Sequence, residues 1–231
     1  PFYGERGGQV GDIGEIKNDN FIFKVNNTSK IFGNYFLHWG KVIKGNCKVE
    51  EHILATIDIK RRNLIRCNHS STHLLHASLR QILGNHVAQK GSLVNDEKLR
   101  FDFSHNEPIN NNTLNKIENI VKEQIKNDTF VETKILDQKK AIQDGAIALF
   151  GEKYGEEVRV VFMGKENNGF FSTELCGGTH VKNTKEVGKF KVISQSSISS
   201  GVRRIEALRD KQLQDYEKSL KKDKSLKEKT T

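Results

Sequence analysis

The chain of 231 residues contains few cysteines and no long apolar run, and both absences narrow its class. Three cysteines are too few for the disulfide framework of a small secreted domain, which indicates a reducing compartment. No apolar stretch approaches the roughly 18 residues that cross a bilayer, and the mean hydropathy is −0.62. The printed sequence shows no signal-peptide pattern either. We therefore expect a cytoplasmic protein without a membrane partner.

An excess of acidic residues is also lacking. The sequence has 38 Lys and Arg against 29 Asp and Glu, a formal net charge of +9. Such a balance favours a polyanionic partner, because lysine and arginine neutralise phosphates. A genome rich in lysine and asparagine codons explains the same composition equally well. Charge alone therefore does not name the partner.

Two short pairs of metal-ligand residues stand out. They are His69-x3-His73 and Cys176-x3-His180, about a hundred residues apart. A His-x3-His pair alone is weak evidence, because surface helices carry that spacing by chance. Together the pairs supply four imidazole and thiolate donors, which suit a tetrahedral Zn²⁺ shell. The sequence therefore predicts a zinc site built from both pairs.

The local sequences explain how each pair converges. Residues 68–84 show helical apolar spacing, with Asn68 as the expected N-cap and Gly84 as the stop signal. Two histidines at i and i+4 of such a helix point to one face. In the second pair, two glycines between Cys176 and His180 allow a tight turn. We interpret His76 on the same helix as a satisfied, partly buried histidine.

The chain divides into three zones that differ in their residue patterns. Residues 1–63 alternate β-prone runs with Gly and Asn turns, a pattern typical of a small antiparallel β-barrel. Residues 64–208 predict an α+β, two-layer domain, with helices on one face of a mostly antiparallel sheet. Residues 209–231 predict a basic helical tail, the start of a helical region that continues beyond the sequence. In the middle zone we expect strands near 86–94, 98–104, 130–136, 157–163, 168–175 and 187–206 and a helix near 113–127.

Several motifs taken in order resemble the editing region of alanyl-tRNA synthetase, a member of the threonyl/alanyl second additional domain superfamily. They are PFYGERGGQVGD at 1–12, RR at 61–62, NHSSTHLLH at 68–76, QKGSLV at 89–94, LRFDFSH at 99–105, CGGTH at 176–180 and GVRRIEAL at 201–208. These motifs span nearly the whole chain. Ser71 departs from the family, where alanine is common at that position.

The resemblance implies an aminoacyl-tRNA hydrolase that acts on tRNA(Ala) mischarged with serine or glycine, with no role for DNA. Its zinc ligands match His69, His73, Cys176 and His180. The resemblance also implies that Gly7 and Gly8 form a loop that helps to select the substrate serine. It implies that Thr72 and Gln89 are catalytic and supply the active-site hydroxyl and amide.

The parent enzyme of this family is alanine–tRNA ligase. Its ATP-dependent aminoacylation domain would precede Pro1, so we expect the present chain to be a piece of a longer protein that cannot itself make alanyl-tRNA. Four protein ligands would close the zinc shell, which favours zinc as an organiser of the cleft over zinc as the activator of a water.

Contacts to tRNA phosphates are expected from basic residues within the matching motifs, because such contacts position a nucleic acid without specifying its sequence. The candidates are Arg62, Lys90, Arg203 and Arg204, with Arg61 and Arg100 as further ones. Each of them is individually as well explained by a solvated or salt-bridged surface residue.

Two alternatives to an excised editing region stay open at this point. One is a free-standing trans-editing deacylase of the same superfamily. The other is a noncatalytic RNA-binding module in which zinc only stabilises the fold. The rate of ester hydrolysis distinguishes the second alternative from both hydrolases.

Overall fold

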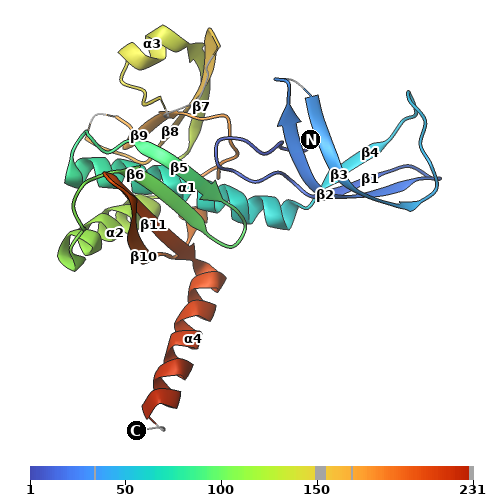
Figure 1. The fold of residues 1–231 in the computed structure, drawn as a ribbon. Helices are drawn as coiled ribbons and strands as arrows, with labels where there is room; N and C mark the ends of the chain where they lie inside the picture. Colours follow the sequence, from blue (N-terminus) through green and yellow to red (C-terminus); the bar gives the residue numbers. More distant parts are fainter. Residues whose placement is uncertain (34, 149–154, 168, 229–231) are drawn as a thin grey trace.

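The computed structural model describes residues 1–33, 35–148, 155–167 and 169–228. Within this part of the chain three antiparallel sheets and four α-helices form an α+β fold, as predicted. A small sheet at the N-terminal end is joined by a long helix to a larger body that contains the other two sheets (Figure 1).

The first sheet is open, and the prediction of a β-barrel is wrong. Its strand order is β3-β2-β1-β4, so β3 and β4 lie at the two edges and do not pair with each other. β1 and β4 have only four residues each, too few for a sheet that must curl back to its first strand. The strands are β1 (Gly14–Lys17), β2 (Ile22–Ile31), β3 (Tyr35–Lys44) and β4 (Leu54–Ile57).

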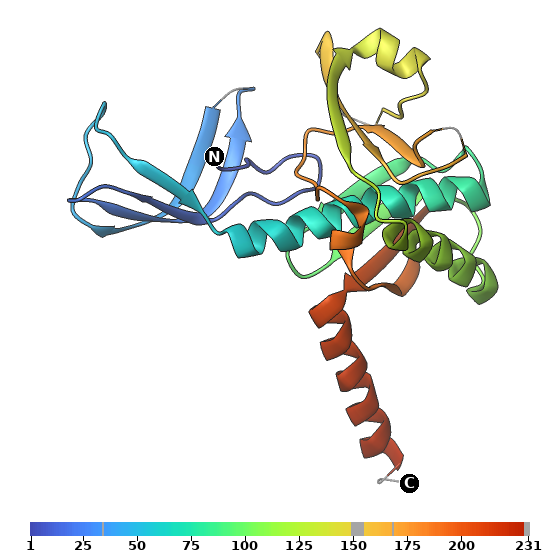
Figure 2. The same cartoon turned by 180° about the vertical axis from the view of Figure 1, so that it is seen from behind.

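Helix α1 (Ile59–Leu83) carries the chain from the first sheet into the body (Figure 2). It begins earlier than predicted, because the N-cap is Asp58, whose carboxylate accepts a hydrogen bond from the Arg61 amide. The prediction that Asn68 caps this helix is wrong. Asn68 is buried inside it, and its amide donates to the Asn95 carbonyl at 2.7 Å. Gly84 ends the helix, as predicted, with a φ of 113°.

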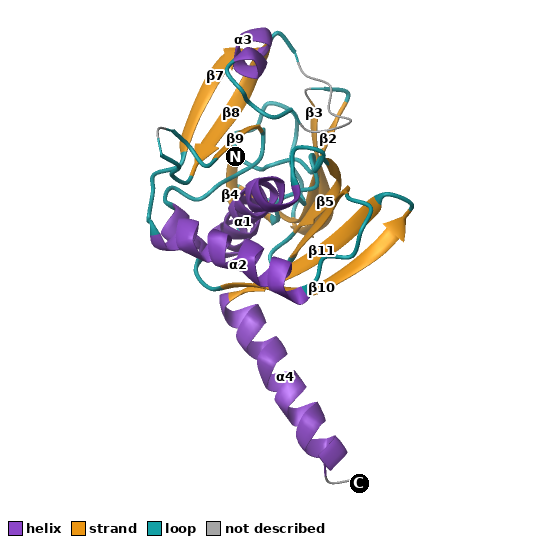
Figure 3. Cartoon of the chain, turned by 90° about the vertical axis from the view of Figure 1, so that its left-hand side faces the viewer, coloured by secondary structure: helices purple, strands orange, loops and turns teal. Residues whose placement is uncertain are grey.

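The second sheet has the order β10-β11-β6-β5. Helices α1 and α2 lie side by side on one of its faces (Figure 3). Apolar side chains from both layers are fully buried between them, among them Leu74, Phe101 and Ile117. The elements are β5 (Gln89–Val94), β6 (Leu99–Ser104), α2 (Asn111–Lys126), β10 (Phe190–Ser199) and β11 (Val202–Arg209).

The remaining strands form a third sheet instead of extending the second one. Its order is β7-β8-β9, and the short helix α3 packs against it. The strand predicted at 168–175 is shorter in the structure, and its residue 168 lies outside the described residues. The elements are β7 (Glu132–Asp137), α3 (Gln138–Gln143), β8 (Glu157–Met163), β9 (Ser172–Leu175) and the 3-10 turn η1 (Thr184–Val187).

Helix α4 (Asp210–Glu228) leaves the body from the end of β11 and projects away from it (Figure 1). Leu213 in its first turns is buried, whereas Leu220 further along is exposed. The tail predicted at 209–231 is therefore helical where it is described, and residues 229–231 lie outside the described part. None of the helices in the described ranges combines the length and apolarity of a membrane span.

Candidate metal centre

The two predicted ligand pairs meet at one point of the body. α1 presents His69 and His73, and the loop after β9 presents Cys176 and His180. All four donor atoms lie within 4.8 Å of one another. Cys176 Sγ is 3.4 Å from Nε2 of His69 and 3.4 Å from Nε2 of His180. Because Zn–S and Zn–N bonds of ordinary length give a tetrahedral edge of about 3.6 Å, this cluster can hold a metal ion.

An unsatisfied nitrogen on His73 supports that interpretation. His73 Nδ1 lies 2.8 Å from a carboxylate oxygen of Glu174, so Nδ1 donates its hydrogen to that oxygen. Nε2 is buried and has no hydrogen-bond partner among the described residues. A buried polar nitrogen without a partner is costly. A metal ion bound by the cluster would displace any proton from this nitrogen and satisfy it.

Glu174 is the main residue that the sequence reasoning missed. Its carboxylate is almost fully buried and accepts hydrogen bonds from His73, from His76 Nδ1 at 3.1 Å and from Ser172 Oγ at 3.1 Å. Burial alone would raise the pKa of Glu174, but His76 and His73 outweigh it and hold this pKa well below its usual value. Burial would likewise lower the pKa of His73, but Glu174 and Cys176 raise it to about 10.

A second missed residue, Gln9, supports His69 from the N-terminal segment. Gln9 is fully buried, and its Oε1 lies 2.7 Å from His69 Nδ1 and accepts from the Thr179 amide at 2.9 Å. A hydrogen bond at Nδ1 directs Nε2 of the same ring toward the metal cluster. Residues 1–12 thus complete the surroundings of a ligand that lies on α1.

The loop from Cys176 to His180 is held in place by one arginine. Arg159 of β8 donates to the Cys176 carbonyl at 2.9 Å and to the Gly178 carbonyl at 2.7 Å. Gly178 lies so close to the His69 ring that any Cβ at this position would overlap it. The glycine predicted to permit a tight turn therefore also makes room for a ligand.

The electrostatics of the cluster favour a thiolate at Cys176 beside a neutral imidazole at His180. Burial alone would raise the pKa of Cys176, but the charges of His69 and His180 lower it well below its usual value. Burial and the charge of His69 lower the pKa of His180 to about 3. Thiolate and neutral imidazole are the protonation states that bind Zn²⁺.

A cavity of about 350 Å³ opens beside the cluster, with His69 and Cys176 in its wall. Gly7 lines the same cavity. Gly7 and Gly8 have φ of 58° and 82° and form the two central residues of a tight hairpin turn, closed by reciprocal hydrogen bonds between Arg6 and Gln9. The predicted Gly-Gly loop is therefore a turn next to the metal cluster.

Two protein families match this chain. Residues 1–61 match the model described as tRNA synthetases class II (A). Residues 158–206, which include Cys176 and His180, match the threonyl and alanyl tRNA synthetase second additional domain. The chain carries an alanyl-tRNA synthetase editing region. Synthetases of these families act on tRNA, so the matches imply tRNA as the partner of the editing region.

Neither of the predicted catalytic residues lines the cavity of the editing region. Thr72 is buried in α1, and its hydroxyl donates to the Asn68 carbonyl of the preceding turn at 2.9 Å. Gln89 lies half-buried at the start of β5. The structure thus brings together the four predicted metal ligands and Gly7, whereas Thr72 and Gln89 lie elsewhere in the same body.

The candidate tRNA contacts of the editing region differ in their surroundings. Arg62 is buried and bonds both carboxylate oxygens of Asp12, one of them through Nε at 2.8 Å. Arg203 is also buried. Arg204 forms two hydrogen bonds to Asp102 of the neighbouring strand, at 2.7 and 2.8 Å. Lys90 on β5 is exposed, and exposure makes it the most accessible of the four to a phosphate.

Proposed function

We propose that this editing region hydrolyses the ester bond of tRNA(Ala) mischarged with serine or glycine. The observation that supports the proposal most directly is the convergence of His69, His73, Cys176 and His180 beside a cavity. Four such donors suit Zn²⁺, which we propose as the resident ion. When bound, the ion would order the loop after β9 and place a positive charge near the aminoacyl end.

The need for such a site follows from the size of the amino acids. An alanine pocket cannot strongly reject glycine or serine, because a missing methyl or an added hydroxyl changes the binding free energy by only about 1–3 kcal/mol. A second site that destroys the wrong products therefore adds selectivity. A serine ester offers such a site a hydroxyl that an alanine ester lacks.

The residues of the editing region have the following proposed roles. His69, His73, Cys176 and His180 hold the ion and so fix one wall of the cavity. We assign selection of serine to the Gly7–Gly8 turn and to Thr72. Thr72 is buried outside the cavity lining and its hydroxyl already donates to Asn68, so it could accept from a serine hydroxyl only if the pocket rearranges toward α1 when the substrate binds. We assign Gln89 a polar contact to the ester or ribose.

Deacylation of seryl-, glycyl- and alanyl-tRNA(Ala), measured together with the metal content of the protein, tests the proposal. We expect the protein to hydrolyse the serine and glycine esters faster than the alanine ester. His73→Ala and Cys176→Ala should lose both this activity and the bound zinc. Cys47→Ala is the matched control, because Cys47 is exposed and lies outside the cluster.

Two outcomes would count against the proposal. Unchanged deacylation rates in both ligand variants would show that the activity does not depend on the metal cluster. If the protein contains zinc and binds tRNA, but the serine ester is hydrolysed only at its uncatalysed rate, the protein is instead a noncatalytic RNA-binding module.

A further inference from the structure

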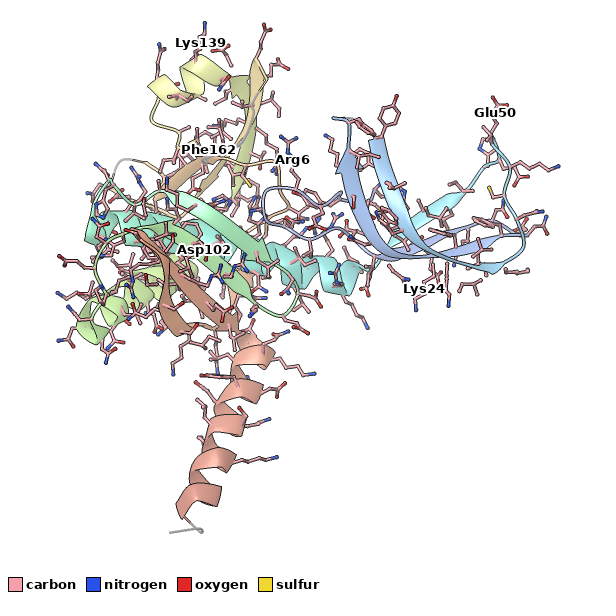
Figure 4. All side chains as sticks on the ribbon, viewed as in Figure 1. Arg6, Lys24, Glu50, Asp102, Lys139 and Phe162 are labelled. Carbon is pink, nitrogen blue, oxygen red and sulfur yellow. The ribbon has the colours of Figure 1, made fainter. Side chains whose placement is uncertain are left out.

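The cavity beside the metal cluster has a second wall that the proposed chemistry does not use. This wall comes from the first sheet and the N-terminal loop, and it includes Tyr3, Arg6, Lys30 and Phe36. Figure 4 shows Arg6 on the loop that reaches from the first sheet toward the body. The cavity of about 350 Å³ falls within the range of small-molecule sites, which is about 300–1,000 Å³.

Phe36 is placed to stack on a ligand. It lies on β3, and half of its side chain is exposed, although it lines the cavity. Lys30, its partner on β2, places Nζ 5.5 Å from the centroid of the Phe36 ring. Proteins that bind single-stranded nucleic acids use this combination of an aromatic ring and a lysine. A base stacks on the ring, and the cation binds a phosphate.

The charges around the cavity also favour a nucleotide. Arg6, Lys30 and Arg159 bring three cationic side chains to the lining, against one carboxylate, that of Glu157. Arg159 is already committed to the Cys176 and Gly178 carbonyls. Lys30, in the wall formed by the first sheet, therefore supplies a cation to the side of the cavity that the metal ligands do not form.

We propose that the β2–β3 hairpin is the nucleoside platform of the editing region. The base of the 3′-terminal adenosine of tRNA stacks on Phe36, and Lys30 binds the phosphate on its 5′ side. The aminoacyl ester then extends across the cavity toward His69 and Cys176. This inference rests on the proposed function, and it assigns to the first sheet a direct role in holding the substrate.

Two non-hydrolysable probes test the platform by direct binding to the full chain. One is adenosine that carries a 3′-linked seryl amide, and the other is the trinucleotide CCA with the same amide. Phe36→Leu keeps an apolar side chain but removes the ring, and should weaken binding of both probes about five- to tenfold. Lys30→Ala should weaken only the trinucleotide, and should lower the slope of log affinity against log salt by about 0.7.

Matched controls come from the opposite face of the same strand. Tyr35 and Lys41 are exposed residues of β3 whose side chains alternate away from that of Phe36. Tyr35→Leu and Lys41→Ala should bind both probes like the wild type. Thermal unfolding of all four variants shows whether any loss of binding reflects loss of folding.

The outcomes separate this inference from the proposed function. If the wild-type protein binds neither probe, or if Phe36→Leu binds both like Tyr35→Leu, the platform is refuted, whatever the deacylation assay shows. If binding depends on Phe36 and Lys30 but the serine ester is not hydrolysed, the platform stands and the proposed function fails.

Discussion

Glu174→Gln tests whether a buried carboxylate controls the metal centre. One carboxylate oxygen accepts from both His76 and Ser172, and the other accepts from His73. A glutamine of the same shape has one acceptor oxygen and one NH2 group. We expect the oxygen to face the two donors, His76 and Ser172, so that the NH2 group faces His73 Nδ1.

That orientation changes the tautomer of His73. An NH2 group opposite Nδ1 requires Nδ1 to accept, and the ring proton moves to Nε2, the nitrogen that faces the metal cluster. A protonated Nε2 cannot bind a metal. Loss of such a supporting partner typically costs about 10–100-fold in metal affinity, or about 1.4–2.7 kcal/mol.

Competition with a chromophoric zinc chelator measures this loss. Glu97→Gln is the control, because it makes the same chemical change at an exposed site. The fold of Glu174→Gln should be checked by circular dichroism, since the residue is buried. Equal zinc affinities for Glu174→Gln and the wild type would refute the argument that Glu174 sets the protonation of His73.

Two further predictions concern the loop ligands and pH. Gly178→Ala should lose zinc, as measured by metal content, because its Cβ would overlap the His69 ring; a variant with a full complement of zinc would contradict the close packing. The metal-free protein should lose stability as pH falls from about 6.5 toward 3, because the unfolded chain then protonates His180, whose pKa is lowered to about 3 in the folded state. Urea unfolding at several pH values, with a chelator present, measures the effect, and a free energy of unfolding that stays constant below pH 6.5 would contradict it.

Local spacing was sufficient to predict the four residues whose cluster could hold a metal ion. His69 and His73 share a helix face at i and i+4, and Cys176 and His180 are joined through two glycines. Each pair is recognisable within five residues. The residues that support the ligands are not. Glu174 follows its partner His73 by 101 positions, and Gln9 precedes His69 by 60, so no short pattern connects them.

Two errors in the predicted fold have related physical causes. Asn68 precedes an apolar run and looks like a cap, yet the helix already begins after Asp58, an earlier residue whose carboxylate caps it through the Arg61 amide. The β-barrel was wrong because alternation of apolar residues reports which face of a strand is buried. It does not report whether the outer strands β3 and β4 meet.

The separation of the two ligand pairs has a consequence for biosynthesis. Cys176 follows His69 by 107 positions. A ribosome must therefore translate all of the intervening residues before the nascent chain could coordinate a metal ion with four donors. The first two histidines alone would form an incomplete shell, and Gln9 can support His69 only when residues 1–12 fold back onto α1. Binding of a metal ion by all four residues would therefore require that Gln9, α1 and the loop after β9 have already come together.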